Sequence, residues 1–120
     1  MEGEGKPRFN EVISDIIEKS LFTERQIEII LNKRGIRKGS FRISRGAYYR
    51  QVAQSREKTV SFLYSLVLLR GLGVLEDGDI DVMDKLSGQI RVINEGDIFP
   101  EHVDDVMRRL DEFVRDACRM

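Results

Sequence analysis

KRGIRKGSFRISRGAYYRQVAQSREKTVSFLYSLVLLR, residues 33–70, is the stretch that decides the fold. Its first part, residues 33–58, contains nine Lys or Arg and a single acid, Glu57, which gives a local charge of +8 in a chain whose net charge is −1. Its second part is apolar at helical spacing. We therefore expect a helical fold in which a basic front end meets an anionic partner and an apolar back end is anchored in a core.

The rest of the chain is acidic. Residues 1–32 sum to −3, residues 59–74 to +1 and residues 75–120 to −7. A charge run is often only a solvated face, but nine cations against one acid favour an anionic partner on this stretch. The acidic remainder would repel a nucleic acid and would confine the contact to one face.

Length and composition indicate one soluble domain. A chain of 120 residues with 41% hydrophobic and 34% charged residues can bury a single modest core. No apolar run approaches the roughly 18 residues of a membrane span, so no membrane association is expected. The N-terminal MEGEGKPRF has no apolar signal-peptide core. The single cysteine, Cys118, excludes an internal disulfide and is typical of a reducing compartment, which predicts a cytoplasmic location.

The first two helices are indicated by spacing and capping. Apolar residues from Phe9 to Ile17 follow 3–4 spacing, which predicts an amphipathic helix that ends near Ser20. Thr23 and Gln26 form a capping box at the start of a second helix. Gly35 supplies the left-handed residue that ends it.

Two further helices are expected in the decisive stretch. Ser44 caps a short helix over residues 45–53, Gln54 and Ser55 form a turn, and Ser55 caps a fourth helix that runs to about Arg70. One face of this helix is apolar and is expected to pack on the core: Val60, Leu63, Tyr64, Val67 and Leu68. Phe62, Leu66 and Leu69 lie on other faces, so this helix is either central in the domain or covered by a second subunit.

Residues 79–94 fit two structures. As a helix capped by Asp79, they place six apolar residues within one arc of roughly 160°. As a hairpin that turns at Ser87 and Gly88, they pair Val82 with Ile93, and this hairpin would be the wing of a winged helix. The acidic first strand and the absence of an Arg cluster at the tip favour the helix.

The C-terminal segment is expected to be a helix with Pro100 in its first turn. A 3-4-3-4 repeat runs along it: Val103, Val106, Leu110, Phe113 and Ala117. This seam either packs within its own domain or forms a dimer interface with the apolar end of the fourth helix. The expected organisation is a tail over residues 1–8, a DNA-binding core over 9–76 and a dimerisation segment over 77–120, all in one domain.

The stretch Gly46 to Ser65, GAYYRQVAQSREKTVSFLYS, resembles the helix-turn-helix of bacterial and archaeal transcription regulators. SREKTV is similar to the start of many recognition helices, and LLRGLGVL, residues 68–75, is similar to the exit from such a helix in winged-helix regulators. Two positions depart from the motif: Arg50 stands where a small residue packs the two helices, and Gln54 stands where the turn usually has glycine. The resemblance implies a mostly α, winged-helix-like helix-turn-helix domain with a C-terminal dimerisation helix.

This resemblance assigns the candidate contacts. Ser55, Arg56, Lys58 and Thr59 would lie in the first turn of the recognition helix and would contact bases in the major groove. Backbone phosphates would be held by the connector, the start of the third helix and one tyrosine: Arg37, Lys38, Arg42, Ser44, Arg45, Tyr49 and Arg50. The dimer interface would comprise Phe62, Leu66 and Leu69 together with the C-terminal seam.

The sequence thus predicts a dimeric, sequence-specific double-stranded DNA-binding transcription regulator. An enzyme is not expected, because the single histidine, His102, and the single cysteine lack partners for a catalytic or zinc site, and no cofactor motif is present. Two alternatives stay open. One is an adaptor whose basic patch binds an acidic protein, and the other is an RNA-binding protein, although the stretch offers few stacking aromatics.

Overall fold

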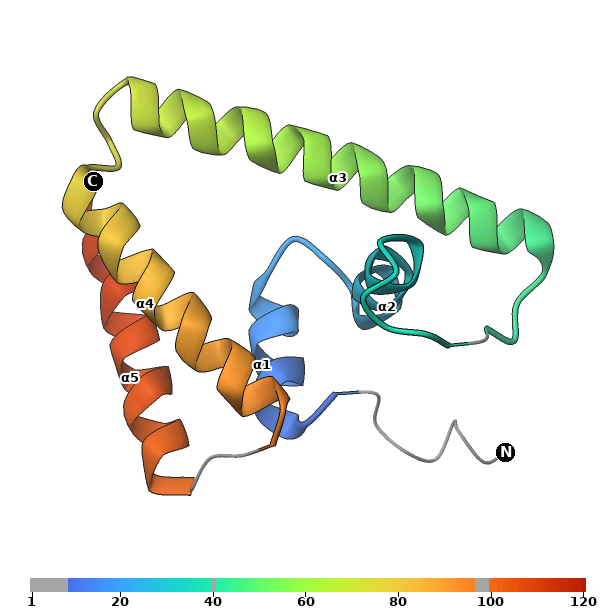
Figure 1. The fold of residues 1–120 in the computed structure, drawn as a ribbon. Helices are drawn as coiled ribbons and strands as arrows, with labels where there is room; N and C mark the ends of the chain where they lie inside the picture. The colour runs from blue at the N-terminus through green and yellow to red at the C-terminus, as the bar shows by residue number, and fades with distance from the viewer. Residues whose placement is uncertain (1–8, 40, 97–99) are drawn as a thin grey trace. The chain divides into compact units, whose positions relative to one another are not determined.

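The structure of the chain is a computed structural model that describes residues 9–39, 41–96 and 100–120. Within these ranges it contains five α-helices and no strand (Figure 1), namely α1 Glu11–Lys19, α2 Glu24–Lys33, α3 Arg45–Gly71, α4 Asp77–Asn94 and α5 Pro100–Ala117. The expected helical class is confirmed, and the winged-helix form that the resemblance implies is wrong for the described residues, which contain no strand. The predicted tail, residues 1–8, lies outside them. None of these helices combines the length and the apolar character that a membrane crossing requires.

Contacts divide the described residues into two compact units, and each is described by itself. The N-terminal unit comprises Ser14–Ser65, which includes α2 and most of α3. The C-terminal unit comprises Phe9–Ile13 and Leu66–Met120, which include α4 and α5.

The capping signals in the N-terminal unit are confirmed. The Thr23 hydroxyl accepts a hydrogen bond from the Gln26 amide at 3.1 Å, and the Gln26 side chain accepts one from the Thr23 amide at 3.1 Å. Gly35 has a φ of 72° at the end of α2, a conformation that favours glycine. The Ser44 hydroxyl caps α3 by accepting from the Ala47 amide at 3.1 Å.

The predicted turn at Gln54 and Ser55 is wrong, because α3 continues without interruption from Arg45 to Gly71. A tight helix-turn-helix turn needs a residue with positive φ, and Gln54 is not one: among the described residues only Gly35, Gly73 and Gly96 have positive φ. No glycine or proline occurs between Ala47 and Arg70 to break the helix.

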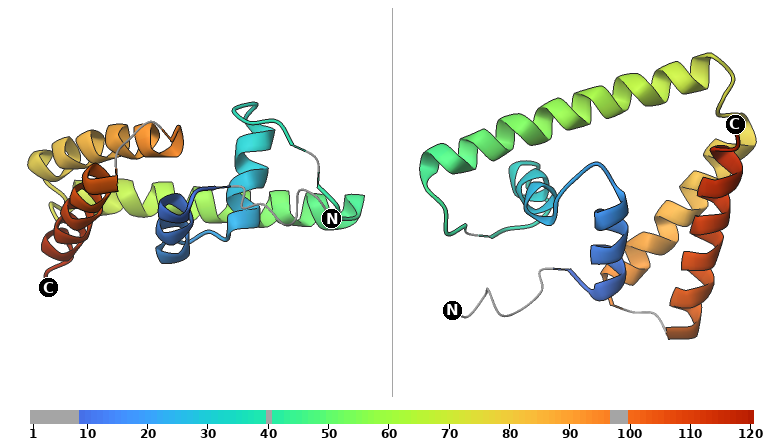
Figure 2. Two further views of the ribbon diagram at one scale, coloured as in Figure 1. Left: turned by 90° about the horizontal axis from the view of Figure 1, so that it is seen from below. Right: turned by 180° about the vertical axis from the view of Figure 1, so that it is seen from behind.

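Polar groups join α2 to α3 in the N-terminal unit. Lys58 Nζ donates to the carbonyl oxygen of Leu21 and to Gln26 Oε1, both at 2.8 Å. Near the start of α3, the Tyr48 hydroxyl donates to Asn32 Oδ1 at 2.8 Å. Ile29 is buried beside them. In two views, α2 crosses α3 at a steep inclination (Figures 1 and 2).

The C-terminal unit includes the last residues of α3 and the turn that follows them. Gly73, with a φ of 86°, reverses the chain, and the Val74 amide bonds back to the Leu69 carbonyl at 2.9 Å. Residues 79–94 form a helix, as favoured from the sequence, and Ser87 and Gly88 lie inside α4. A two-stranded ribbon is only marginally stable alone, whereas the helix places Leu86 and Ile93 in a core.

α4 and α5 pack against each other side by side (Figure 2). Leu86, Ile93 and Val106 are buried at 5%, 2% and 2% exposure. Asn10 adds the start of α1 to this unit, because its side-chain amide donates to the Ile93 carbonyl at 2.8 Å. Val106, the second residue of the predicted C-terminal seam, is therefore buried in the core of its own chain.

Candidate nucleic-acid interface

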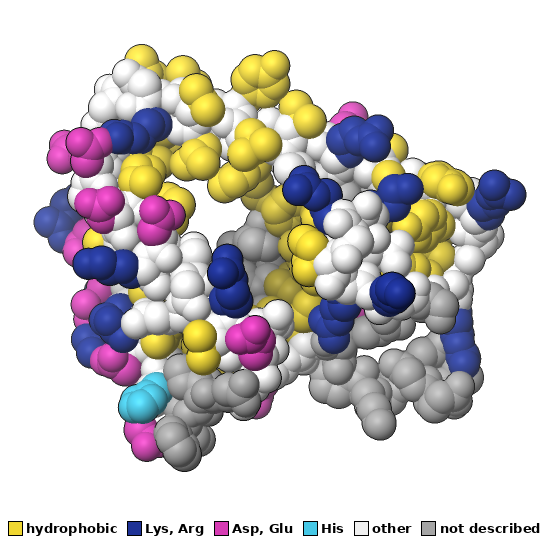
Figure 3. Space-filling model, in the orientation of Figure 1, with side chains coloured by type: hydrophobic (Ala, Val, Ile, Leu, Met, Phe, Trp, Pro, Cys, Tyr) yellow, Lys and Arg dark blue, Asp and Glu magenta, His cyan; other side chains and the backbone are white. Residues whose placement is uncertain are grey.

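The connector between α2 and α3 and the first turns of α3 present a group of exposed cations. We call this group the basic surface, and its members are Arg34, Arg37, Lys38, Arg42, Arg45 and Arg50. Figure 3 shows Lys and Arg side chains gathered over α2 and the start of α3, whereas acidic side chains are concentrated over α4 and α5. The charge asymmetry of the sequence is therefore also an asymmetry of the folded surface.

Aromatic contacts hold the connector against the helices. Phe41 lies 5.5 Å from Tyr48 between ring centroids, and Tyr48 lies 5.3 Å from Tyr49 in an edge-on arrangement. The Arg25 guanidinium stands 5.7 Å from the centre of the Phe41 ring. Contacts of this kind fix the positions of the rings and each add a small amount of stabilising free energy. Tyr48 takes the packing role, and Tyr49 stays 52% exposed.

Two neighbouring hollows are lined by four of the seven predicted phosphate contacts, and Arg42, Ser44 and Arg50 are not in their linings. One is lined by Arg37 and Lys38, the other by Arg45 and Tyr49, and both are bordered by Asn32, Gly39 and Phe41. Asn32 also contacts the connector directly, because its side-chain amide donates to the Gly39 carbonyl at 3.4 Å. This role of Asn32 was not predicted, because a polar residue in the last turn of α2 is not by itself a signal.

The predicted base-reading residues do not form one exposed edge. Ser55 is 2% exposed, Lys58 is bonded to the α2 side of the unit, and Thr59 donates back to the Ser55 carbonyl at 2.9 Å. Only Arg56 is exposed. Without a turn at Gln54, this segment is the middle of a helix, and three of its four side chains face the interior. The prediction of a recognition helix that starts at Ser55 is therefore wrong.

The cations of α3 itself point to different sides of the helix. At 3.6 residues per turn, Arg50 and Lys58 each lie about 140° round the axis from Arg45, in opposite directions. Arg45 and Arg50 flank the exposed N-terminal end of α3, whereas the Lys58 ammonium group is used in hydrogen bonds within the unit. A contact with a nucleic acid therefore has to use the start of α3 and the connector.

The apolar residues of α3 are distributed differently from the prediction. Tyr64, expected on the core face, is 76% exposed, and at 100° per residue it lies opposite the buried Ser55. Val60 and Leu63 in the N-terminal unit and Val67 and Leu68 in the C-terminal unit are 46–70% exposed. Phe62 and Leu69, proposed for the dimer interface, are 42% and 38% exposed, and Leu66 is half-buried.

The remaining members of the predicted C-terminal seam are intermediate in exposure, namely Val103, Leu110, Phe113 and Ala117. No group of three or more His, Cys, Asp or Glu side chains is arranged to hold a metal ion in the part of the chain that the structure describes. In comparisons with protein-family models, curated proteins and solved structures, no match to the chain is found.

Proposed function

We propose that the chain is a dimeric DNA-binding regulator that contacts double-stranded DNA through the basic surface. The observation that carries the proposal is the set of six exposed cations around the connector and the start of α3. Each cation that neutralises a phosphate releases condensed counterions, and this release supplies much of the affinity of proteins for duplex DNA.

The start of α3 is the element best suited to approach the duplex. Ser44, Arg45, Tyr49 and Arg50 are exposed there, and the first amides of a helix attract phosphate oxygens. Arg45 or Arg50 can also donate to guanine in the major groove. In this arrangement, base contacts come from the N-terminal end of α3, and Arg37, Lys38 and Arg42 of the connector bind the backbone.

The proposed dimer uses the exposed apolar side chains of α3. Tyr64, Val67 and Leu68 are 76%, 70% and 58% exposed, and large apolar groups of this kind are enriched where a second protein binds. Sedimentation should give about twice the 13.9 kDa of one chain, and Val67→Glu should shift the protein to the monomer. A wild-type monomer at high concentration would contradict the dimer.

A second candidate is a protein-interaction adaptor, which the same exposed α3 side chains support. An adaptor would use the basic surface to bind an acidic protein and would have little affinity for nucleic acid. The two candidates therefore differ in their response to duplex DNA.

The test is a titration of a labelled random-sequence duplex at several salt concentrations. DNA binding through six cations predicts that log K falls with log salt at a slope of about −5. An affinity for the duplex that is negligible at about 50 mM salt would favour the adaptor instead. A parallel titration with duplex RNA separates a general polyanion contact from a preference for B-form DNA.

A further inference from the structure

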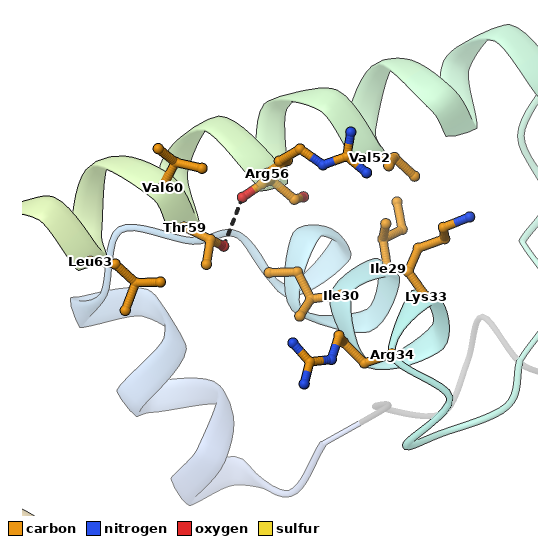
Figure 4. A pocket seen from close by; sticks show the side chains of 10 residues that line it. Ile29, Ile30, Lys33, Arg34, Val52, Arg56, Thr59, Val60 and Leu63 are labelled. Atoms are coloured by element: carbon orange, nitrogen blue, oxygen red, sulfur yellow. Dashed lines mark hydrogen bonds between the residues drawn. The ribbon is translucent and has the colours of Figure 1, made fainter.

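An open groove lies between α2 and α3 in the N-terminal unit, separate from the hollows of the basic surface. Its volume is about 250 Å³, close to the lower end of the range for small-molecule sites. Figure 4 shows its apolar wall, formed by Ile29 and Ile30 of α2 and by Val52 and Leu63 of α3. The groove is therefore large enough for a small apolar ligand.

Ser55 lines this groove and carries a hydroxyl without a hydrogen-bond partner among the described residues. The residue is 2% exposed. Two other hydroxyls of α3 donate hydrogen bonds to carbonyl oxygens of the preceding turn. Thr59 donates to the Ser55 carbonyl at 2.9 Å, and Ser65 donates to the Ser61 carbonyl at 2.8 Å. Buried polar groups in folded proteins almost always have a partner, so the Ser55 hydroxyl is able to bond to a group from outside the described residues.

The groove is bordered by cations and by no acid. Lys33 and Arg34 come from the end of α2 and Arg56 comes from α3 (Figure 4). Lys33 lies 5.9 Å from the centre of the Tyr49 ring. Neither Arg34 nor Arg56 has a carboxylate partner within the described ranges. Guanidinium groups at the border of an apolar groove whose lining contains no acidic side chain are complementary to an anion.

We propose that this groove binds a small amphipathic carboxylate. Its aliphatic part lies on the Ile, Val and Leu side chains, its carboxylate is bound by Arg34 or Arg56 at the border of the groove, and Ser55 rotates its hydroxyl to become a partner of the ligand. A purely apolar ligand would leave the two guanidinium groups unpaired, and a bare anion would leave the apolar wall exposed to water. This ligand class goes beyond the proposed DNA binding, and it is testable without DNA.

Octanoate is the probe, and three compounds are its matched controls: 1-octanol without the charge, octylamine with the opposite charge and acetate without the chain. Binding is measured by calorimetry, and amide and methyl NMR shifts report its position. We expect saturable binding of octanoate at least about ten-fold tighter than binding of any control, with the largest shifts at Ile30, Val52 and Thr59. Equal binding of octanoate and octanol, or shifts confined to other parts of the chain, would overturn the proposal.

Variants of the groove complete the test. Arg34→Gln with Arg56→Gln should weaken octanoate about ten-fold or more, and Ser55→Ala should weaken it by about three-fold or more without loss of folding, because the change removes an unsatisfied group. Arg50→Gln and Ser61→Ala, on the outward side of α3, should leave the affinity unchanged. An unchanged affinity in the double arginine variant would overturn the anionic ligand class, and an unchanged affinity in Ser55→Ala would overturn the role of Ser55.

Discussion

Among the described residues, the N-terminal unit buries two polar side chains, Gln26 and Ser55, as well as Ile17 and Ile29, whereas the buried side chains of the C-terminal unit are all apolar. Lys58 connects α3 to α2 through two hydrogen bonds, and in the other unit Leu86, Ile93 and Val106 form the core. On α5, Arg108 pairs with Asp105 and Glu112, and Arg109 pairs with Asp105.

The difference shows where the chain can bind other molecules. Ion pairs between residues one turn apart occur on α5 of the C-terminal unit, and the N-terminal unit has pairs of the same kind, Lys19 with Asp15 and Arg25 with Glu28. In the N-terminal unit a cluster of cations remains exposed, a hydroxyl is buried without a partner and an apolar groove is open. We infer that the surfaces for an anionic partner and for a small ligand lie in the N-terminal unit, whereas the proposed dimer contact on α3 also includes Val67 and Leu68 of the C-terminal unit.

The largest expected effect is in the apolar core. Ile93→Ala should lower the free energy of unfolding by about 2–5 kcal/mol, because it leaves a cavity beside Leu86 and Val106. Urea unfolding followed by circular dichroism measures it. The adjacent Val92, which is 40% exposed, is the control, and Val92→Ala should cost less than about 1 kcal/mol. Equal costs for the two variants would contradict the assigned core.

A smaller effect is expected where polar groups join α2 to α3. Lys58→Met should destabilise the protein by about 1–3 kcal/mol, because it removes two hydrogen bonds from a charged donor and leaves Gln26, which is buried, with one partner fewer. Lys85→Met, at an exposed cation of α4, should be nearly neutral. If Lys58→Met weakened duplex binding and left stability unchanged, Lys58 would contact DNA instead.

The smallest effect concerns the charges of α5. The hydrogen bond from Arg108, together with the charge of Arg109, holds the pKa of Asp105 below its usual value. A lowered pKa stabilises the fold above the unfolded-state pKa, and this stabilisation is lost as the pH falls through the folded-state pKa. The difference in melting temperature between wild type and Arg108→Gln should therefore shrink as the pH is lowered below the ordinary aspartate pKa of about 3.9. A difference that persists unchanged in acid would contradict this origin.

The sequence predicts local structure well where a specific residue is required. Thr23 with Gln26, Ser44 and Gly35 mark helix ends by hydrogen bonds and backbone conformation that few other residues supply, and each is confirmed. The helix over residues 79–94, favoured because the alternative wing would have an acidic first strand and no Arg cluster at its tip, is also confirmed.

Two predictions about α3 are wrong: the turn at Gln54 and Ser55, and the face that packs on the core. The turn was predicted from a resemblance to a two-helix motif. That motif usually has a glycine where this chain has Gln54, and a turn with positive φ depends on such a residue. The packed face was also assigned by hydrophobicity, which selected Tyr64 and Val67. The face that packs on α2 in fact contains Tyr48, Ser55 and Lys58, because polar contacts join these helices. Only the position of α2 in three dimensions identifies that face.

The most direct test of DNA binding by the basic surface removes three positive charges from each unit in turn. Lys38→Gln, Arg45→Gln and Arg50→Gln are combined in one protein, and Lys85→Gln, Arg91→Gln and Arg115→Gln in another; all six residues are exposed. The affinity for a labelled duplex is measured at about 100 mM salt. We expect the first protein to bind about 100-fold more weakly than wild type and the second to bind as tightly as wild type or more tightly. Equal losses in the two proteins, or an unchanged affinity in the first, would contradict the account.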